Sequence, residues 1–513
     1  MSILSRKGFV ESRRFVTAIV VVLIFGTFIL SDPYFSYVED ETAIITAARH
    51  PASMTVKLFV SGNGQHEHPP LSDIVLHFWL PVAGQSLTLL RVPSIVFFLV
   101  GLVLLAVAAE KVSKRSAFLA VITIGAVSPF TFHFARMAGW YSFCFFLVSA
   151  LTCVYLRYIE TASGTALCCF VTIAVALVYS NYYGWVIVGC LLVDCWAVRR
   201  SGVRRLAFVT IGVMVLAYAP LWRAFFRETV NGSHAGTLVS RIALGAYSLY
   251  VLFVSESVAP WIWYFAVPTS AALALALQTS WISVNVRQRL FLLYFAVCFV
   301  GLTVTGKVES KRLLFISPWL ILVLGVAWAE ASTGLRRRMG FALVILASAG
   351  WLGIVTRKWY AAPHFIEPWK EVADKAAQSV RNGGLVVSNS PAFSFYMNYA
   401  LARDLRRRDS FLPGWINDPR VLSVEQLDQA FAVDAKNIVF VQGVNQNLIR
   451  QTVEFTRRIE QKCTLLGSEH LVPDAGSALK ERFFPQFKQP RFRITIQRYL
   501  CPEAQIAGKN SGA

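Results

Sequence analysis

Long apolar runs separated by short charged loops dominate this sequence and limit the folds that it can adopt. Hydrophobic residues make up 56% of the 513-residue chain, whereas charged residues make up only 15%. Soluble globular proteins do not carry so large an apolar share. An apolar run of about twenty residues is long enough to cross the hydrocarbon core of a membrane as a helix. The pattern therefore predicts an integral membrane protein that crosses the bilayer many times.

Basic residues indicate which loops lie in the cytoplasm. The formal net charge is +20, and most of the excess falls before the first apolar run and at alternate turns between later runs. These residues are Arg6, Lys7, Arg13, Arg14, Lys111, Lys114, Arg115, Arg199, Arg200, Arg204, Arg205, Arg287, Arg289, Arg336, Arg337 and Arg338. The positive-inside rule explains such clusters without a nucleic-acid partner, so we expect membrane lipids as neighbours and no nucleic acid.

At roughly twenty residues a span, about eleven transmembrane helices fit the sequence. The first, near 15–31, has no small-residue cleavage site after it and is expected to stay as a signal anchor. With the N-terminus inside, an odd number of spans leaves everything after about 357 outside the cytoplasm. Helical and extended patterns alternate there. We therefore predict an all-α polytopic membrane domain over 1–356 and an extracytoplasmic α/β domain over 357–513. Residues 241–258 are amphipathic and are expected to lie along the membrane interface.

An acidic cluster, Glu39-Asp40-Glu41, follows the first span at the start of a long outer loop over 32–84. Carboxylates beside hydrocarbon lose hydration, so a cluster at this depth is expected to have a function. A carboxylate here is placed to act as a base on a lipid-carried substrate. The alternative is that Asp40 and Glu41 only stabilise the start of a helix over Thr42–His50.

The same outer loop contains His66-Glu67-His68-Pro69-Pro70. Histidine and glutamate are metal ligands, but two histidines on a loop with no evident third ligand are weak evidence for a bound metal. The two prolines fix the backbone and so aim Glu67 and His68.

Several cations lie on the side that the positive-inside rule disfavours. Arg136 ends the third span, and Lys307, Lys311 and Arg312 precede the tenth. A guanidinium binds two phosphate oxygens at once, which favours phosphate contact for Arg136 and Arg312. The alternative, preferred for Lys307, is that the side chain reaches toward lipid headgroups.

Seven of the nine cysteines lie in apolar runs, where they behave as small hydrophobic residues. The other two, Cys463 and Cys501, lie in the polar C-terminal part. If that part is outside the cytoplasm they are free to form a disulfide. Their spacing alone leaves two unpaired thiols equally open.

Taken together, these features resemble the GT-C glycosyltransferases, in particular the bacterial branch that is similar to protein O-mannosyltransferases and lipid A sugar transferases. The resemblance covers about 30–330 and depends on the order of short motifs. These are Asp40-Glu41, Glu67-His68-Pro69-Pro70-Leu71, Arg91-Val92-Pro93-Ser94, and Ser128-Pro129 followed by Ala135-Arg136 and Tyr141, with looser matches at Asn181-Tyr182-Tyr183-Gly184 and Lys311-Arg312. In the family Arg is followed closely by Met-Tyr, whereas here Ala138-Gly139-Trp140 comes before Tyr141.

The resemblance implies a sugar donor carried on a polyprenyl phosphate and an acceptor hydroxyl on a lipid, glycan or protein. Asp40 would be the general base, with Glu41 beside it. Arg136, with Arg312 or Lys311, would stabilise the phosphate that leaves, and the sugar would be inverted. No cofactor is required.

The remaining residues of the implied site bind or position substrate. Glu67 and His68 would position the acceptor or the base. Trp140 would take the place at the site wall that Tyr141 has in the family, and Tyr183 would line the same site. The implied location is the plasma membrane of a bacterium, with the site and the C-terminal domain outside.

Two other functions fit the composition. A transporter or flippase for lipid-linked saccharides would place charges in the middle of spans and show inverted repeats, and neither is seen in the sequence. A non-catalytic membrane anchor would use the C-terminal domain to bind glycan.

Overall fold

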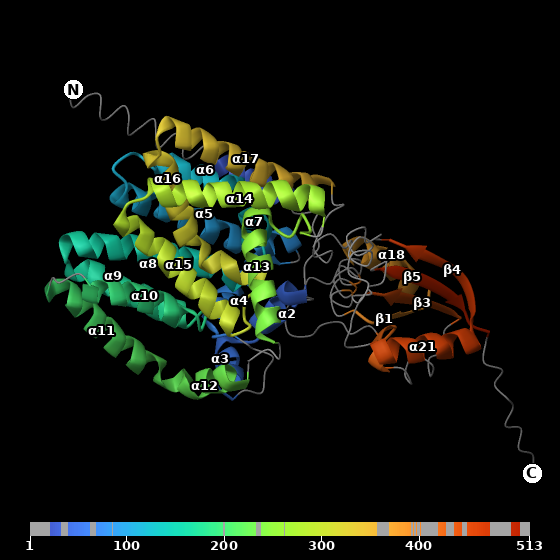
Figure 1. The fold of residues 1–513 in the computed structure, drawn as a ribbon. Coiled ribbons are helices and arrows are strands. Elements are labelled where there is room, and N and C mark those ends of the chain that lie inside the picture. Colours follow the sequence, from blue (N-terminus) through green and yellow to red (C-terminus); the bar gives the residue numbers. More distant parts are fainter. Residues whose placement is uncertain are drawn as a thin grey trace, which may run out of the picture. The chain divides into compact units, whose positions relative to one another are not determined.

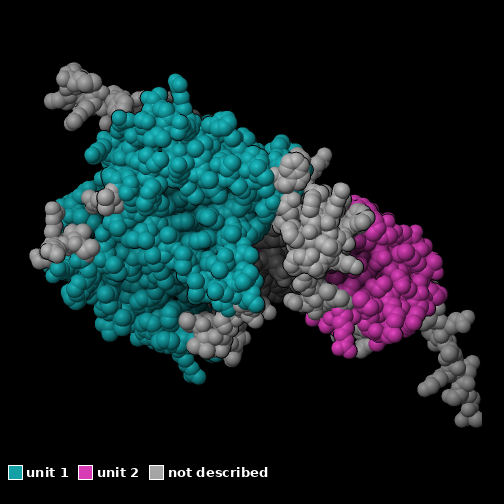
Figure 2. All heavy atoms as spheres, in the orientation of Figure 1, with its two compact units in different colours: residues 1–32, 44–361 teal, residues 33–43, 362–513 magenta. Residues whose placement is uncertain are grey.

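The structure is a computed structural model, and it divides into two compact units (Figure 2). Unit 1 comprises Met1–Asp32 and Ile44–Ala361, and unit 2 comprises Pro33–Ala43 and Ala362–Ala513. The residues that the structure describes are 21–31, 39–61, 68–84, 86–197, 201–231, 237–260, 262–356, 369–390, 393, 397, 401, 419–426, 436–443, 449–471 and 494–502.

Unit 1 is built from helices (Figure 1). Five described helices are long and apolar enough to cross a membrane, and a bent pair, α6 and α7, would make a sixth. Further apolar helices of 10–17 residues accompany them. Unit 1 therefore has the helices of a multi-pass membrane protein, while the expected total of about eleven spans stays a prediction.

The helices are as follows. Helix α2 is Glu39–Ala48, and the helices that follow are α3 (Ala52–Ser61), α4 (Leu71–Ala83), α5 (Leu87–Val112), α6 (Phe118–Val127), α7 (Pro129–Ala135), α8 (Trp140–Thr161), α9 (Gly164–Val178), α10 (Gly184–Ala197), α11 (Ser201–Tyr218), α12 (Trp222–Asn231), α13 (Leu238–Val254), α14 (Trp263–Ser283), α15 (Val286–Val304), the 3-10 helix η3 (Ser310–Phe315), α16 (Ser317–Glu330) and α17 (Thr333–Thr356).

Close packing of α5 on α8 and of α16 on α6 forms the core of this bundle. A Cβ added to Gly101 of α5 would lie 2.8 Å from the ring of Phe145 and 2.9 Å from the backbone of Phe146. A Cβ on Gly325 of α16 would lie 3.0 Å from the backbone of Val121. Because lipid provides no hydrophobic driving force between helices, such small residues allow backbones to approach and pack.

The third apolar run is broken into α6 and α7, which are bent by 69°. Pro129 is the first residue of α7, and the Ser128 hydroxyl caps that helix by accepting from the Thr131 amide at 3.4 Å. Proline fits the first turn of a helix but cannot continue the one before it. All seven residues of α7 are buried, so the bend directs this short helix into the bundle.

Helix α13 covers most of the stretch over 241–258 for which an interfacial helix is expected, and its place at the membrane interface stays a prediction. Its last turns are buried, from Tyr250 to Val254. Helices α7, α15 and α17 and the segment η3 pack against it. The first half of α13 is nevertheless largely exposed, with Leu238, Val239 and Ile242 each more than half accessible, so the helix keeps the open surface that an interfacial helix needs.

At the end of the bundle that carries the basic loops, polar contacts join neighbouring helices. The Glu330 carboxylate accepts from the Lys114 amide at 2.9 Å and from the Gln288 amide group at 3.0 Å. Gln288 also donates to the Val112 carbonyl at 3.0 Å. These bonds tie α15 and α16 to the turn after α5.

Unit 2 contains a five-stranded sheet of order β2-β1-β3-β5-β4. Strand β1 pairs in parallel with β2 and β3, whereas β5 is antiparallel to β3 and β4. The elements are α18 (Trp369–Arg381), β1 (Leu385–Ser388), β2 (Val421–Ser423), β3 (Asn437–Gln442), α21 (Ile449–Lys462), β4 (Thr464–His470) and β5 (Thr495–Leu500). The α/β character matches the expectation, and the location outside the cytoplasm stays a prediction.

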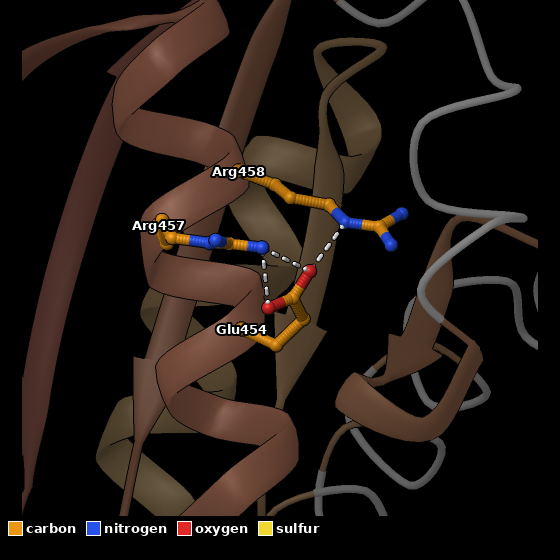
Figure 3. Close-up of polar contacts among 3 residues, drawn as sticks. All are labelled: Glu454, Arg457 and Arg458. Carbon is orange, nitrogen blue, oxygen red and sulfur yellow. Dashed lines mark hydrogen bonds and ion pairs between the residues drawn. The ribbon is translucent and has the colours of Figure 1, made fainter.

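Helix α21 has a charged face that is exposed and an apolar face that is buried. On its exposed face Glu454 accepts hydrogen bonds from Arg457 at 2.9 and 3.0 Å and from Arg458 at 2.8 Å (Figure 3). On its buried face Phe455 and Ile459 pack against the sheet. Exposed ion pairs contribute little to stability, so the buried face holds α21 in place.

A disulfide joins Cys463 to Cys501, the pairing that the sequence left open. Cys463 precedes β4 and Cys501 follows β5, so the bond closes the end of this antiparallel pair. Strand β4 is the last strand of the sheet. A covalent link at that position limits fraying of the edge.

We expect Cys463→Ser to destabilise unit 2. The bond joins residues 38 apart, and closing a loop of this length is worth about 4 kcal/mol in the chain-entropy treatment. Limited proteolysis of the full-length protein in detergent, over a series of temperatures, measures the effect. Cys168→Ser, which removes an exposed free thiol of α9, is the control. If unit 2 became susceptible to the protease at the same temperature in both variants, the prediction would be contradicted.

Candidate active site

Four rings from distant parts of the sequence form a continuous row, which we call the aromatic row. Its members are His68, Trp140, Phe315 and Tyr183. The ring centroids are 4.7 Å apart for His68 and Trp140, 5.7 Å for Trp140 and Phe315, and 6.0 Å for Phe315 and Tyr183. Ring pairs attract at these distances. The row therefore brings together three predicted site residues, with Phe315 as a member that the sequence did not single out.

The backbone near His68 explains how an outer loop is held at the row. Pro69 and Pro70 are both buried, and Pro70 immediately precedes α4. The Leu71 amide donates to the Tyr179 carbonyl at 3.0 Å. Since Tyr179 lies in the turn that leads to Tyr183, this bond fixes His68 and the α9–α10 turn to one another.

Trp140 and Tyr141 lie next to one another at the start of α8. Both side chains are buried, and their ring centroids are 4.2 Å apart. Trp140 also contacts His68 and Phe315. Trp140 thus belongs to the aromatic row, and its place at the site wall in the position of the family's tyrosine stays a prediction.

Arg136 follows the last residue of α7 and is only 3% exposed. Its guanidinium lies 5.5 Å from the centroid of the Phe132 ring, a cation–π geometry. Three residues later, a Cβ on Gly139 would lie 2.8 Å from the side chain of Ile44 in α2. The segment between α7 and α8 is thus packed closely against α2.

Lys311 and Arg312 share one carboxylate, and we call these three side chains the cation cluster. One carboxylate oxygen of Glu309 lies 3.3 Å from Lys311 Nζ, and the other lies 3.3 Å from Arg312 Nη2. Arg312 also donates to the Lys307 carbonyl at 3.2 Å. The side chain of Arg312 is 7% exposed and that of Lys311 is 25% exposed, so Lys311 is the more accessible cation. Glu309 was missed by sequence reasoning, although its place two residues before a lysine and three before an arginine is a usable signal.

The turn after α13 carries a second group of residues that the sequence analysis missed. His133 Nδ1 of α7 lies 2.9 Å from the Ser255 hydroxyl, and the Ser257 hydroxyl donates to the Gly350 carbonyl of α17 at 2.8 Å. Between these serines lies Glu256, which is 8% exposed. An isolated carboxylate at the end of an apolar run was the available signal.

Burial raises the pKa of Glu256 from 4.5 to about 7. Removal from water disfavours the charged carboxylate. A hydrogen bond from Ser310 and the positive charge of Lys311 oppose this rise, and the negative charge of Glu309 adds to it. Glu256 therefore lies beside the cation cluster and changes its charge near neutral pH.

The predicted acidic site residues are only partly described. Glu41 is fully buried in α2. The side chain of Asp40 lies outside the described residues, as do His66 and Glu67 altogether. Within the described ranges, no three histidine, cysteine or acidic side chains are grouped so as to hold a metal ion. The roles of these residues stay predictions.

A cavity of about 670 Å³ lies among α6, α7, α13, α16 and α17. Its lining includes Arg115 and Arg336 from the basic loops, and Ser128 to Thr131 at the break between α6 and α7. The rest of the lining is mostly apolar, with Leu320 and Leu324 as examples. The residues that line it include none of the predicted site residues, so this space is suited to hydrocarbon rather than to the chemistry.

No protein-family description and no curated protein sequence matches this chain. Two solved structures of one protein, ArnT from Cupriavidus metallidurans, are similar to it. The apo state matches with a TM-score of 0.54 and 13% identity over 95% of this chain and 98% of ArnT. The state bound to undecaprenyl phosphate matches with a TM-score of 0.52 and 12% identity over 94% and 97%.

This chain has the fold of ArnT. At this level of identity the finding shows the fold alone, and the GT-C family, with the narrower branch of the resemblance, stays a prediction. The arabinofuranosyltransferase AftD from Mycobacteria matches 95% of this chain and 40% of its own, at 13% identity and a TM-score of 0.47. That similarity is too low to carry an argument.

The raised pKa of Glu256 predicts a pH-dependent stability. A neutral carboxyl is favoured in the folded state, so its contribution is complete below the unfolded pKa of 4.5 and is lost as the pH rises through about 7. The free energy of unfolding falls by about 3 kcal/mol over this pH range. We expect Glu256→Gln, which stays neutral, to raise the apparent melting temperature relative to wild type at pH 8 and to leave it unchanged at pH 4.5. A temperature difference that is constant over this range would contradict the assignment.

Proposed function

We propose that this protein is an integral membrane glycosyltransferase that moves a sugar from a polyprenyl-phosphate donor to an acceptor hydroxyl on the outer face of the membrane. The observation that carries the proposal is the ArnT fold, which extends over nearly the whole of both chains. ArnT has been crystallised with undecaprenyl phosphate, which is a polyprenyl phosphate. The acceptor belongs to a lipid, a glycan or a protein, and the membrane is a bacterial plasma membrane.

The cation cluster supports a phosphate-binding role. Lys311 and Arg312 together carry two positive charges against one negative charge on Glu309. A guanidinium already fixed by Glu309 and the Lys307 carbonyl loses little further freedom when it binds. Phe315 belongs both to η3 and to the aromatic row, so rings suited to a sugar adjoin cations suited to phosphate.

The proposed reaction is a single displacement. Asp40 accepts the proton of the acceptor hydroxyl as that oxygen attacks the anomeric carbon. The bond from the anomeric carbon to the phosphate oxygen breaks, and the lipid phosphate departs with the electron pair from the opposite face. Inversion follows from this geometry. Arg136, Arg312 and Lys311 stabilise the charge that develops on the phosphate.

The apolar cavity supports a hydrocarbon-carrying donor. It is lined by five helices of unit 1, and its lining includes Ser128 to Thr131, two residues before His133 and five before Arg136 on the same chain segment. A prenyl chain in this cavity would therefore lie near the segment that carries Arg136. Glu67 and His68 would then position the acceptor or Asp40.

We expect Asp40→Asn to lower sugar transfer by about 10²–10⁴-fold, because the amide cannot accept the proton. The assay measures transfer from radiolabelled polyprenyl-phosphate sugar in proteoliposomes. Glu39→Gln, one residue earlier in the same helix, is the control and should transfer at the wild-type rate. Normal transfer by Asp40→Asn would remove the base from the mechanism. Movement of labelled lipid across the bilayer with no bond cleaved would instead favour a flippase.

We expect Arg312→Gln to lower the transfer rate by about 10²–10³-fold, because it removes a donor that stabilises phosphate charge. Arg337→Gln is the matched control, since Arg337 is an exposed cation on α17 at the opposite end of the bundle. A loss confined to protein yield, with unchanged rate for each folded molecule, would contradict the role.

A further inference from the structure

The turn that carries Glu256 is held in a single conformation by contacts on several sides. Ser255 bonds to His133 of α7, and Ser257 bonds to Gly350 of α17. A Cβ on Gly353 would lie 2.3 Å from the Ser257 carbonyl oxygen, so α17 is in direct contact with the turn. Glu256 is thereby placed as accurately as a residue within a helix.

The backbone of Ser255 supports the same conclusion. Its φ is 64° and its ψ is −178°, a region that is almost exclusive to glycine. Such a conformation costs about 1–3 kcal/mol and persists only where the surroundings determine it. Strain of this kind gathers at functional sites, and here it directly precedes a buried carboxyl group.

The charged and titratable groups around Glu256 come from three directions. Glu309 and Lys311 face it from the segment that contains η3, and the Ser310 hydroxyl bonds to it from the same segment. Tyr247 of α13 is within electrostatic reach. His133 of α7 bonds to the adjacent Ser255, and the contacts from α17 come from glycines.

When it is ionised, Glu256 is therefore a second negative charge within electrostatic reach of Lys311. With Glu256 protonated, the cation cluster and Glu256 together carry a net charge of plus one, from Lys311, Arg312 and Glu309. With Glu256 ionised, the net charge of the same four side chains is zero. An anion that binds Lys311 is therefore held more strongly when Glu256 carries its proton.

We infer that Glu256 is a positioning residue that couples phosphate binding at Lys311 to the uptake of one proton. The inference rests on the proposed function, because it assigns Lys311 to the phosphate of a polyprenyl-phosphate substrate. Binding of phosphate and binding of the proton favour one another, and this coupling is reciprocal. At a fixed charge of the phosphate, raising the pH through neutrality weakens the hold on phosphate and so favours release of the lipid phosphate product.

The test measures the dissociation constant of undecaprenyl phosphate for the full-length protein in nanodiscs, from pH 5.5 to 8.5. The probe itself ionises in this range, so wild type is compared with Glu256→Gln at each pH. We expect equal affinities within about twofold at pH 5.5 and about tenfold weaker binding by wild type at pH 8.5. A tenfold change corresponds to one pKa unit of coupling. A ratio that does not change with pH overturns the inference.

Two further variants separate positioning from a purely structural role. Glu256→Asp retains the carboxyl group and should retain a pH-dependent ratio, which a packing defect would not restore. In the Lys311→Gln background, Glu256→Gln should no longer change the affinity at pH 8.5, because the coupled cation is gone. If Glu256→Gln does not fold, the dissociation constant of Lys311→Gln is divided by that of wild type at each pH; this ratio should fall as the pH rises, and a ratio that stays constant overturns the inference.

The outcomes distinguish this inference from the proposed function. A protein that transfers sugar but shows a constant affinity ratio retains the proposed function and loses the role of Glu256. A protein that shows the pH-dependent ratio but cleaves no sugar–phosphate bond retains a proton-coupled phosphate site and loses the proposed enzyme activity.

Discussion

Polar groups inside a membrane-spanning bundle need partners within the protein, because hydrocarbon offers none. Unit 1 meets this constraint with hydrogen bonds between segments at both ends. At one end Gln288 and Glu330 join α15 and α16. At the other end His133 bonds to Ser255 across the bundle. The broken helix α6–α7 depends on the same constraint, because its freed backbone and its buried side chains are held by neighbouring helices.

The positions of some uniformly apolar spans could be predicted from the sequence to within a few residues. A span expected near 86–109 is Leu87–Val112, and one expected near 141–157 is Trp140–Thr161. Composition suffices there because every residue of such a span faces either lipid or another helix. The bend at Ser128 was not predicted, although a Ser-Pro pair indicates that a helix is interrupted there. Its angle depends on how α7 packs, which no local pattern contains.

The candidate site was also predictable from the sequence only in part. The resemblance placed His68, Trp140 and Tyr183 in one site, and the structure brings their rings together through Phe315. Glu256 was not found, because a carboxyl group that acts on a cation 55 positions later leaves no periodic signal. In unit 2 the edge strand β4 was likewise missed. Its residues are mostly exposed, so it lacks the alternation by which a half-buried strand is recognised.

The acidic partners of Lys311 explain how a phosphate site can also release its product. Interactions that bind donor and product equally raise affinity without raising the rate of the chemical step. Lys311 and Arg312 alone would hold a departing lipid phosphate strongly, since charges attract more strongly where water is scarce. Glu309 lies 3.3 Å from each cation and offsets part of this attraction. In the mechanism that we propose, a carboxyl group that ionises near neutral pH offsets a further part only when its proton has left, so the same cations would first bind phosphate and then release it.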